Sequence, residues 1–120
     1  MALIYHLAPA VRWGGWPADQ PYLPAEYAAE GFIHCTLGDA VMLGVANRFY
    51  RSAPGEFVLL VIDPEQISAP LRWEPPVHPA GAAGPAAAPL FPHIYGPIDR
   101  AAVIEVRAVR RAPDGEFLGW

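Results

Sequence analysis

The sequence predicts a small α+β domain built on a split or curved β-sheet. Five or six short apolar segments have the length and alternation of strands, whereas only one segment, about residues 37–51, has the periodicity of a long helix. Strands and helices do not alternate regularly along the chain, so a doubly wound parallel sheet is not expected. With 120 residues, 53% of them hydrophobic and 17% charged, the chain is predicted to form a single domain, 1–120.

The first predicted elements are two short strands separated by irregular, proline-rich chain. The expected strands are residues 3–7 and 32–35, and single helical turns are expected between them at 9–13 and 24–30. Gly31 directly follows the second turn and is the expected C-cap, because glycine adopts the left-handed conformation without strain.

Alternation determines which side chains share a face of these two strands. In the first strand, Ile4 and His6 lie on the same face. In the second, one face carries Phe32, His34 and Thr36, while Ile33 and Cys35 take the core side. The hydroxyl of Thr36 is also placed to cap the following helix, with Asp39 in capping-box register.

The helix expected over about 37–51 has an apolar stripe at helical spacing. The stripe consists of Leu37, Val41, Val45 and Phe49, with Met42 and Ala46 beside it. The polar residues Asn47, Arg48 and Arg51 lie off this stripe.

The C-terminal half is predicted to be mostly strands. The expected elements, in order, are a buried central strand at 57–62, a short helical turn starting at Asp63-Pro64, and strands at 71–74, 90–97 and 101–110. The last of these alternates in the manner of an edge strand, with Ala102, Ile104, Val106 and Ala108 toward the core. The segment 75–89 is rich in proline, alanine and glycine and is expected to be a mobile loop.

Charge and composition exclude several classes of protein. The net charge is −4 and all eight basic residues are arginines, so a basic face for duplex nucleic acid is not expected. No apolar run is long enough to span a bilayer, and the N-terminus lacks the features of a signal peptide. The single cysteine, Cys35, excludes an internal disulfide, and a cytoplasmic location is therefore expected.

Three histidines lie inside strand-like segments: His6, His34 and His93. A single histidine in a strand is usually a hydrogen-bonded structural residue, but three in separate strands raise the prospect that some converge on a site. Metal binding is not expected, because no HxH or HxxxH spacing exists and no carboxylate lies near these histidines in sequence. A reactive thiolate at Cys35 is not expected either, since alternation places it on the core side.

The strand 71-LRWE-74 supplies further candidates. Arg72 and Glu74 share one face, and Trp73 points the other way. The pair is either a surface ion pair beside a core tryptophan or part of a site in which Glu74 acts as an acid, a base or a hydroxyl-orienting group. Tyr95 lies on the same strand face as His93, where it could stack on or hydrogen-bond to a ring.

The segments IYHL, EGFIHCT, VANRFY, VLLVID, LRWE and FPHIYGP together resemble a bacterial and plant family, the domain-of-unknown-function family 952. The likeness extends from about Leu3 to Arg107. That family in turn resembles, more distantly, the ADP-ribosyltransferase-like fold, and within it the RNA 2'-phosphotransferase branch, which uses NAD. This resemblance implies a cleft between two half-sheets, with His6 at one ligand-facing position and His34 with Thr36 at another.

Two functions remain open from the sequence. The first is an enzyme, ADP-ribosyl- or phosphotransferase-like, that binds NAD or a related ribonucleotide, with His6, His34, Glu74 and His93 as catalytic candidates. The second is a binding module that holds a small ligand in the same cleft without turnover. In either case the ligand-binding candidates are Thr36, Arg72, Trp73 and Tyr95. The sequence does not identify any protein partner.

Overall fold

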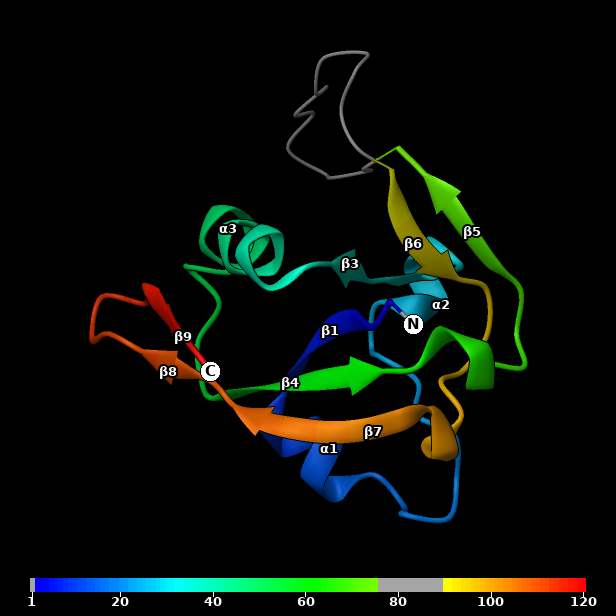
Figure 1. Cartoon of the computed structure of the whole chain (residues 1–120). Helices are drawn as coiled ribbons and strands as arrows, with labels where there is room; N and C mark the ends of the chain where they lie inside the picture. The colour runs from blue at the N-terminus through cyan, green and yellow to red at the C-terminus, as the bar shows by residue number, and fades with distance from the viewer. Residues whose placement is uncertain (1, 76–89) are drawn as a thin grey trace.

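The strands form two antiparallel sheets and a small hairpin. The computed structural model describes residues 2–75 and 90–120. The larger sheet has the order β3-β1-β4-β7, the smaller has the order β2-β6-β5, and β8 pairs with β9 (Figure 1). The split-sheet α+β class expected from the sequence is therefore confirmed at this level. The strands are β1 (Ile4–Pro9), β2 (Ile33–His34), β3 (Thr36–Leu37), β4 (Phe57–Ile62), β5 (Leu71–Glu74), β6 (Phe91–Ile94), β7 (Val103–Ala108), β8 (Arg110–Arg111) and β9 (Phe117–Gly119).

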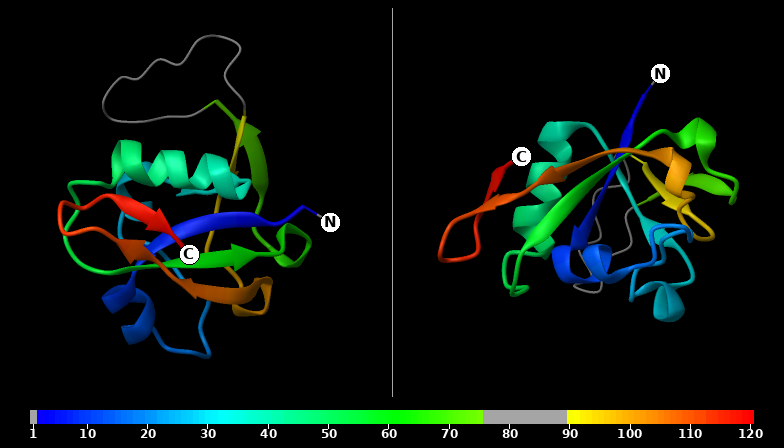
Figure 2. Two further views of the ribbon diagram at one scale, coloured as in Figure 1. Left: turned by 60° about the vertical axis from the view of Figure 1, so that its left-hand side comes forward. Right: turned by 90° about the horizontal axis from the view of Figure 1, so that it is seen from below.

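Three α-helices and two short 3-10 turns complete the described residues. They are α1 (Ala10–Gly15), α2 (Tyr27–Glu30), α3 (Asp39–Phe49), η1 (Pro64–Gln66) and η2 (Arg100–Ala102). Figures 1 and 2 show α3 and α1 on opposite sides of the β1–β4 pair. No helix in residues 2–75 or 90–120 is long and apolar enough to cross a membrane.

The centre of the fold is the pairing of β1 with β4. The two strands align from Ile4 opposite Ile62 to Pro9 opposite Phe57. Apolar side chains on both faces of β4 are buried, as expected for a continuous apolar run. Alternation along both strands then directs successive side chains into two separate cores.

One core lies between the two sheets, and the other lies beneath α3. We call the first the closed core; its buried residues are Ile4, Ala8, Tyr22, Ile33, Cys35, Leu60, Ile62, Ile94, Ile98 and Ala102. We call the second the helix-side core; its buried residues are Leu7, Met42, Ala46, Phe57, Leu59 and Phe117. Neighbouring residues of one strand therefore belong to different cores.

The segment after Gly31 crosses from one sheet to the other. Gly31 caps α2 in the left-handed conformation, with φ 81°, as expected. The single strand expected at 32–35 is wrong, because β2 pairs with β6 whereas β3 pairs with β1, with Cys35 between them. The capping role expected for Thr36 is also wrong: Gly38, with φ 96°, is the N-cap of α3, and no side chain caps that helix.

The buried face of α3 differs from the stripe expected from periodicity. Met42 and Ala46 are buried, whereas Val41 is 44% exposed and Leu37 is 42% exposed. Two adjacent rows of this helix have similar apolar content, so periodicity alone does not decide which row faces the core. The sheet decides it: Met42 and Ala46 are buried in one cluster with Leu7 and Leu59, whereas Val45 of the expected stripe is only partly buried against that cluster.

The edge strand β7 was correctly expected, but of the four residues expected to face the core only Ala102 is buried. Ile104 is 51% exposed and Val106 is 42% exposed. A register shift between Val61 and Ile62 brings Val103, rather than Ile104, opposite Ile62. The alternation expected along this strand therefore fails at an irregularity that period-two counting cannot anticipate. Of the loop expected at 75–89, including His78, all but Pro75 lies outside the described residues.

Candidate functional site

A cleft runs between α2 and α3, over the helix-side face of β1. It consists of two hollows that share Leu7, His34 and Tyr50. The larger has a volume of about 540 Å³ and is lined by Leu7, Pro9, Glu26, Glu30, His34, Arg48, Phe49, Tyr50, Ala53 and Phe57. The smaller has a volume of only about 20 Å³, room for roughly one water molecule. Its walls include Tyr5, Cys35, Thr36, Phe91 and His93.

His34 lies where the two hollows meet. Its Nε2 atom is 2.8 Å from Oε2 of Glu30, the last residue of α2, and its side chain is 17% exposed. The left-handed turn at Gly31 separates the two residues and allows the chain to reverse direction between α2 and β2. A carboxylate bonded to one ring nitrogen fixes the orientation of the ring.

Behind His34 lies a second carboxylate–histidine pair. Nδ1 of His93 is 2.9 Å from Oε1 of Glu74, and the Tyr95 hydroxyl donates to the same oxygen at 2.6 Å. These two hydrogen bonds hold the pKa of Glu74 below its usual range, and the bond from Tyr95 has the larger effect. Burial lowers the pKa of His93, which favours the neutral ring donating its Nδ1–H to the carboxylate.

The two pairs meet across the β2–β6 ladder. His34 and His93 are direct partners in this antiparallel pair, with ring centroids 5.3 Å apart. The Phe32 ring stacks on His93 at 4.4 Å with an interplanar angle of 27°, so it fixes the inner ring in place. The arrangement provides a buried, neutral imidazole beside a partly exposed one, each with a carboxylate.

His6 approaches this site from the opposite face of β1. Its ring is 2% exposed, and its Nδ1–H donates to the backbone carbonyl of His34 at 2.7 Å. Burial lowers the pKa of His6, which favours the neutral form. The structure thus places His6 behind the strand that carries His34, and it reaches the site through the backbone rather than by lining the cleft.

The remaining candidates from the sequence divide between the cleft and the outside of β5. Thr36 is 3% exposed and lines the smaller hollow. Arg72 lies over the Tyr95 ring, with its Cζ atom 5.1 Å from the centroid. Trp73 is 45% exposed rather than a core residue, and alternation along β5 directs it away from Glu74.

Cys35 lines the smaller hollow but belongs to the closed core. Its side chain is 2% exposed, and burial raises the pKa of its thiol. The thiol therefore stays protonated at neutral pH and is a poor nucleophile. Among residues 2–75 and 90–120, no three or more His, Cys, Asp or Glu side chains lie close enough together to hold a metal ion.

Several residues of the cleft were missed from the sequence. The expectation that no carboxylate lies near the histidines is wrong, because Glu30 precedes His34 by four residues and bonds to it. The four-residue spacing of Glu30 and His34 was the only sign of this contact in the sequence. Gly31, the expected end of the helical turn, argued against a helix that contains both residues. Tyr50 and Arg48 were missed because they lie at the end of α3, off its expected apolar stripe. Burial, together with the charges of Glu26 and Glu30, raises the pKa of Tyr50 to about 12, which keeps its hydroxyl a hydrogen-bond donor.

Comparison with protein families identifies the family of the chain, and comparison with solved structures identifies a similar fold. Residues 7–106 match the family described as protein of unknown function (DUF952). The crystal structure of protein CC0527 from Caulobacter crescentus is similar, with a TM-score of 0.73 and 24% identity over 97% of this chain and 93% of that chain. A double mutant of CC0527 gives the same values. No curated protein sequence matches the chain.

Proposed function

The chain belongs to the DUF952 family, and we propose that it is an enzyme that binds NAD or a related ribonucleotide in the cleft at His34. One observation carries the proposal: a carboxylate-bonded histidine lies at the junction of a ligand-sized hollow and a small inner one. Histidine titrates near neutral pH, so a ring held in this way can exchange protons with a bound substrate.

The larger hollow has the chemistry of a ribonucleoside site. Its volume of about 540 Å³ lies within the range of pockets that bind small molecules. Phe49, Tyr50 and Phe57 offer aromatic surface for a base or a nicotinamide ring. Glu26 and Glu30 offer carboxylate acceptors for ribose hydroxyls, as acidic residues do in dinucleotide sites.

The expected reaction is transfer of an ADP-ribosyl or a phosphoryl group. In an ADP-ribosyl transfer, the bond to nicotinamide breaks, a bond to an acceptor hydroxyl forms, and an imidazole accepts the proton that the hydroxyl loses. His34 is the catalytic residue in this proposal, and Glu30 orients it. His6 is a positioning residue that acts through the His34 carbonyl, and the His93–Glu74 pair supports the ring from behind.

The fold supports this function at the level of architecture. The ADP-ribosyltransferase-like fold expected from the sequence has a cleft between two half-sheets. Here the chain crosses from the smaller sheet to the larger at Cys35, next to His34, and the cleft opens beside that crossing. We therefore retain the ADP-ribosyltransferase-like fold as part of the proposal.

A binding module without turnover is the second candidate, and one observation favours it. The Glu74 carboxylate oxygen Oε1 already accepts bonds from His93 and Tyr95, and the His93 side chain is 1% exposed. Glu74 and His93 are therefore already engaged in hydrogen bonds within the protein. His34 is the histidine of the cleft that is most accessible to a ligand.

A histidine-resolved NMR titration tests ligand binding. NAD, ADP-ribose and a ribose 2'-phosphate are added in turn to the wild-type protein, and we expect the His34 and His93 resonances to shift together with one of them. Glu30→Gln is expected to weaken that response, whereas Glu65→Gln, an exposed glutamate outside the cleft, is the matched control. If no histidine responds to any of the three, the nucleotide proposal fails.

Turnover distinguishes the two candidates once a ligand is found. NAD and the ribose 2'-phosphate are supplied together, so that a donor and an acceptor are both present. Release of nicotinamide, or of inorganic phosphate with water as the acceptor, is followed over many equivalents of protein. Multiple turnovers that disappear in His34→Ala support the enzyme. Binding without product from any of these compounds supports the module.

A further inference from the structure

Arg48 is a cation of the cleft that has no ionic partner in the part of the chain that the structure describes. It lies in the last turn of α3, lines the larger hollow and is exposed. Within the described residues it forms no hydrogen bond or ion pair; its guanidinium lies beside the Phe49 ring, with Cζ 5.5 Å from the centroid. Some other arginines do form such bonds: Arg12 with the Leu23 carbonyl, Arg51 with Asp114 and Arg107 with Glu105. Arg48 differs from the remaining unpaired arginines in that it lines the larger hollow.

The same hollow carries two carboxylates that Arg48 does not neutralise. Glu30 bonds to His34, and Glu26 lines the same wall, yet neither forms an ion pair with Arg48 among the described residues. A ligand that fills this hollow therefore meets hydrogen-bond acceptors on one side and a guanidinium on the other. A sugar phosphate meets both requirements, because its hydroxyls donate hydrogen bonds and its phosphate accepts them.

We propose that Arg48 binds a phosphate of the ligand while Glu26 and Glu30 bind ribose hydroxyls, so that the site selects ribose phosphates over uncharged nucleosides. This inference rests on the proposed function, since it names the part of the ligand that Arg48 contacts. The C-terminal end of α3 carries partial negative charge and does not itself attract an anion. The guanidinium must therefore provide the attraction, and its planar fork matches phosphate oxygens.

Isothermal titration calorimetry with three compounds tests the proposal. Adenosine, ribose 5-phosphate and ADP-ribose are titrated into the wild-type protein, Arg48→Ala and Arg48→Lys. A charged hydrogen bond to phosphate corresponds to a change in affinity of about 10- to 100-fold. We expect Arg48→Ala to weaken ADP-ribose and ribose 5-phosphate by at least about 10-fold and adenosine by less than about 2-fold, with Arg48→Lys in between.

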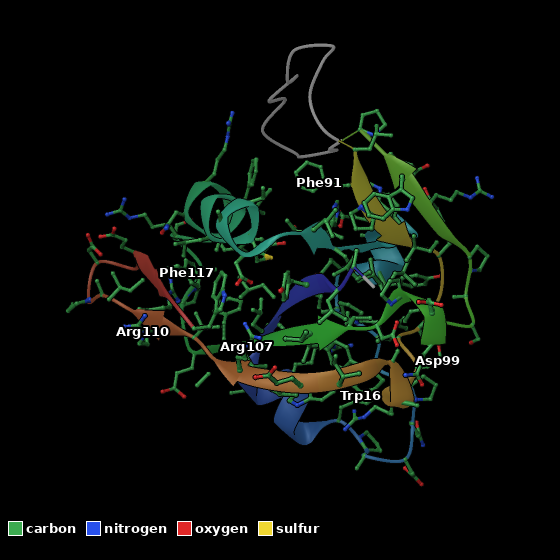
Figure 3. All side chains as sticks on the ribbon, in the orientation of Figure 1. Trp16, Phe91, Asp99, Arg107, Arg110 and Phe117 are labelled. Carbon is green, nitrogen blue, oxygen red and sulfur yellow. The ribbon has the colours of Figure 1, made fainter. Side chains whose placement is uncertain are left out.

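Arg110→Ala is the matched control. Arg110 is an exposed arginine on β8 that lines neither hollow, and Figure 3 shows it at the β8–β9 hairpin. Removing it changes net charge by the same amount as Arg48→Ala, so it corrects for long-range electrostatics. We expect wild-type affinity for all three compounds in this variant.

Failure of this inference and failure of the proposed function give different results. If the wild-type protein binds none of the three compounds, both the proposed function and the proposed role of Arg48 are wrong. If ADP-ribose binds and shifts the His34 resonance, but Arg48→Ala binds it as tightly as Arg110→Ala does, only the role of Arg48 is wrong. Equal losses for adenosine and ADP-ribose in Arg48→Ala would likewise exclude a phosphate contact. Because Arg48 is exposed, its substitution is expected to leave the fold intact, and circular dichroism verifies this.

Discussion

The two faces of β1 carry similar residues, but one face is buried between the sheets and the other lines the cleft. On one face, Ile4 and Ala8 belong to the closed core, and His6 between them is also buried. On the other, Tyr5 and Leu7 face α3 and line the cleft. A histidine on the sealed face has become a structural donor, whereas His34, on the cleft side, remains accessible. Residue type therefore does not define the site; the element that covers each face does.

The largest expected difference between the two regions is in the cost of removing apolar volume. Leu60 is fully buried in the closed core, opposite His6 in the β1–β4 ladder. Leu60→Ala is expected to lower the free energy of unfolding by about 3 kcal/mol, because it loses transfer free energy and leaves a cavity. Val41→Ala, at a position 44% exposed on α3, is expected to change it by less than about 0.5 kcal/mol. Urea unfolding measures both; similar losses would contradict the distinction.

The second prediction separates the two histidines. His6→Ala is expected to cost about 2 kcal/mol of unfolding free energy, because it removes buried volume and the donor to the His34 carbonyl. His34→Ala is expected to cost less than about 1 kcal/mol, because its ring lies at the cleft, but to abolish ligand binding. Urea unfolding and the NMR titration are applied to both variants. A larger loss of stability in His34→Ala than in His6→Ala would reverse the assigned roles.

The third prediction concerns pH. Burial lowers the pKa of His6 in the folded protein, whereas in the unfolded chain it protonates below about pH 6.5. The unfolded state thus binds more protons below that pH, and the free energy of unfolding falls as the pH decreases. His6 contributes at most about 1.4 kcal/mol per pH unit to this slope.

Urea unfolding of the wild-type protein and His6→Gln between about pH 7.5 and about pH 5.5 isolates this contribution, since that window spans the unfolded pKa of histidine. The other titrating groups are common to both proteins, so their effects cancel in the difference. We expect the variant to show the shallower dependence. Equal slopes would mean that His6 protonates as readily in the folded state as in the unfolded one.

The smallest expected effect on stability comes from removing one tyrosine hydroxyl, either in the closed core or beside Glu74. Tyr22 is fully buried in the closed core, and its hydroxyl forms no hydrogen bond of good geometry among the described residues, although the Arg12 side chain lies close to it. Tyr22→Phe is therefore expected to leave stability unchanged or to raise it by up to about 1 kcal/mol. Tyr95→Phe, which removes a donor to Glu74, is expected to lower stability. A loss of stability in Tyr22→Phe would show that its hydroxyl has a partner.

Much of the secondary structure was predictable because short-range patterns specify it. The apolar run at 57–62 became the central strand, and Gly31 became a left-handed cap. Patterns were ambiguous where two neighbouring rows were equally apolar, as on α3, or where a register shift interrupted alternation, as at Val103. In each of these cases the contacts of a distant strand decide the outcome.

The candidate site was predictable only in part. The sequence correctly placed Tyr95 on the same strand face as His93, because alternation places their side chains, but it did not bring Glu74 to either of them. It did not anticipate that Glu30 would bond to His34, nor that Arg48 and Tyr50 would line the cleft. These residues come from different elements, and their proximity depends on how α2 and α3 lie over β1.

The sequence alone determined the class of the fold, the positions of the main strands and the residue types able to do proton chemistry. Local backbone preferences and apolar periodicity act over a few residues, and a single sequence reports them. The tertiary structure decided that His34 lines the cleft while His6 lies sealed behind it. Burial and charge pairing depend on side chains brought together from distant segments, so only the folded chain determines which histidine can meet a ligand.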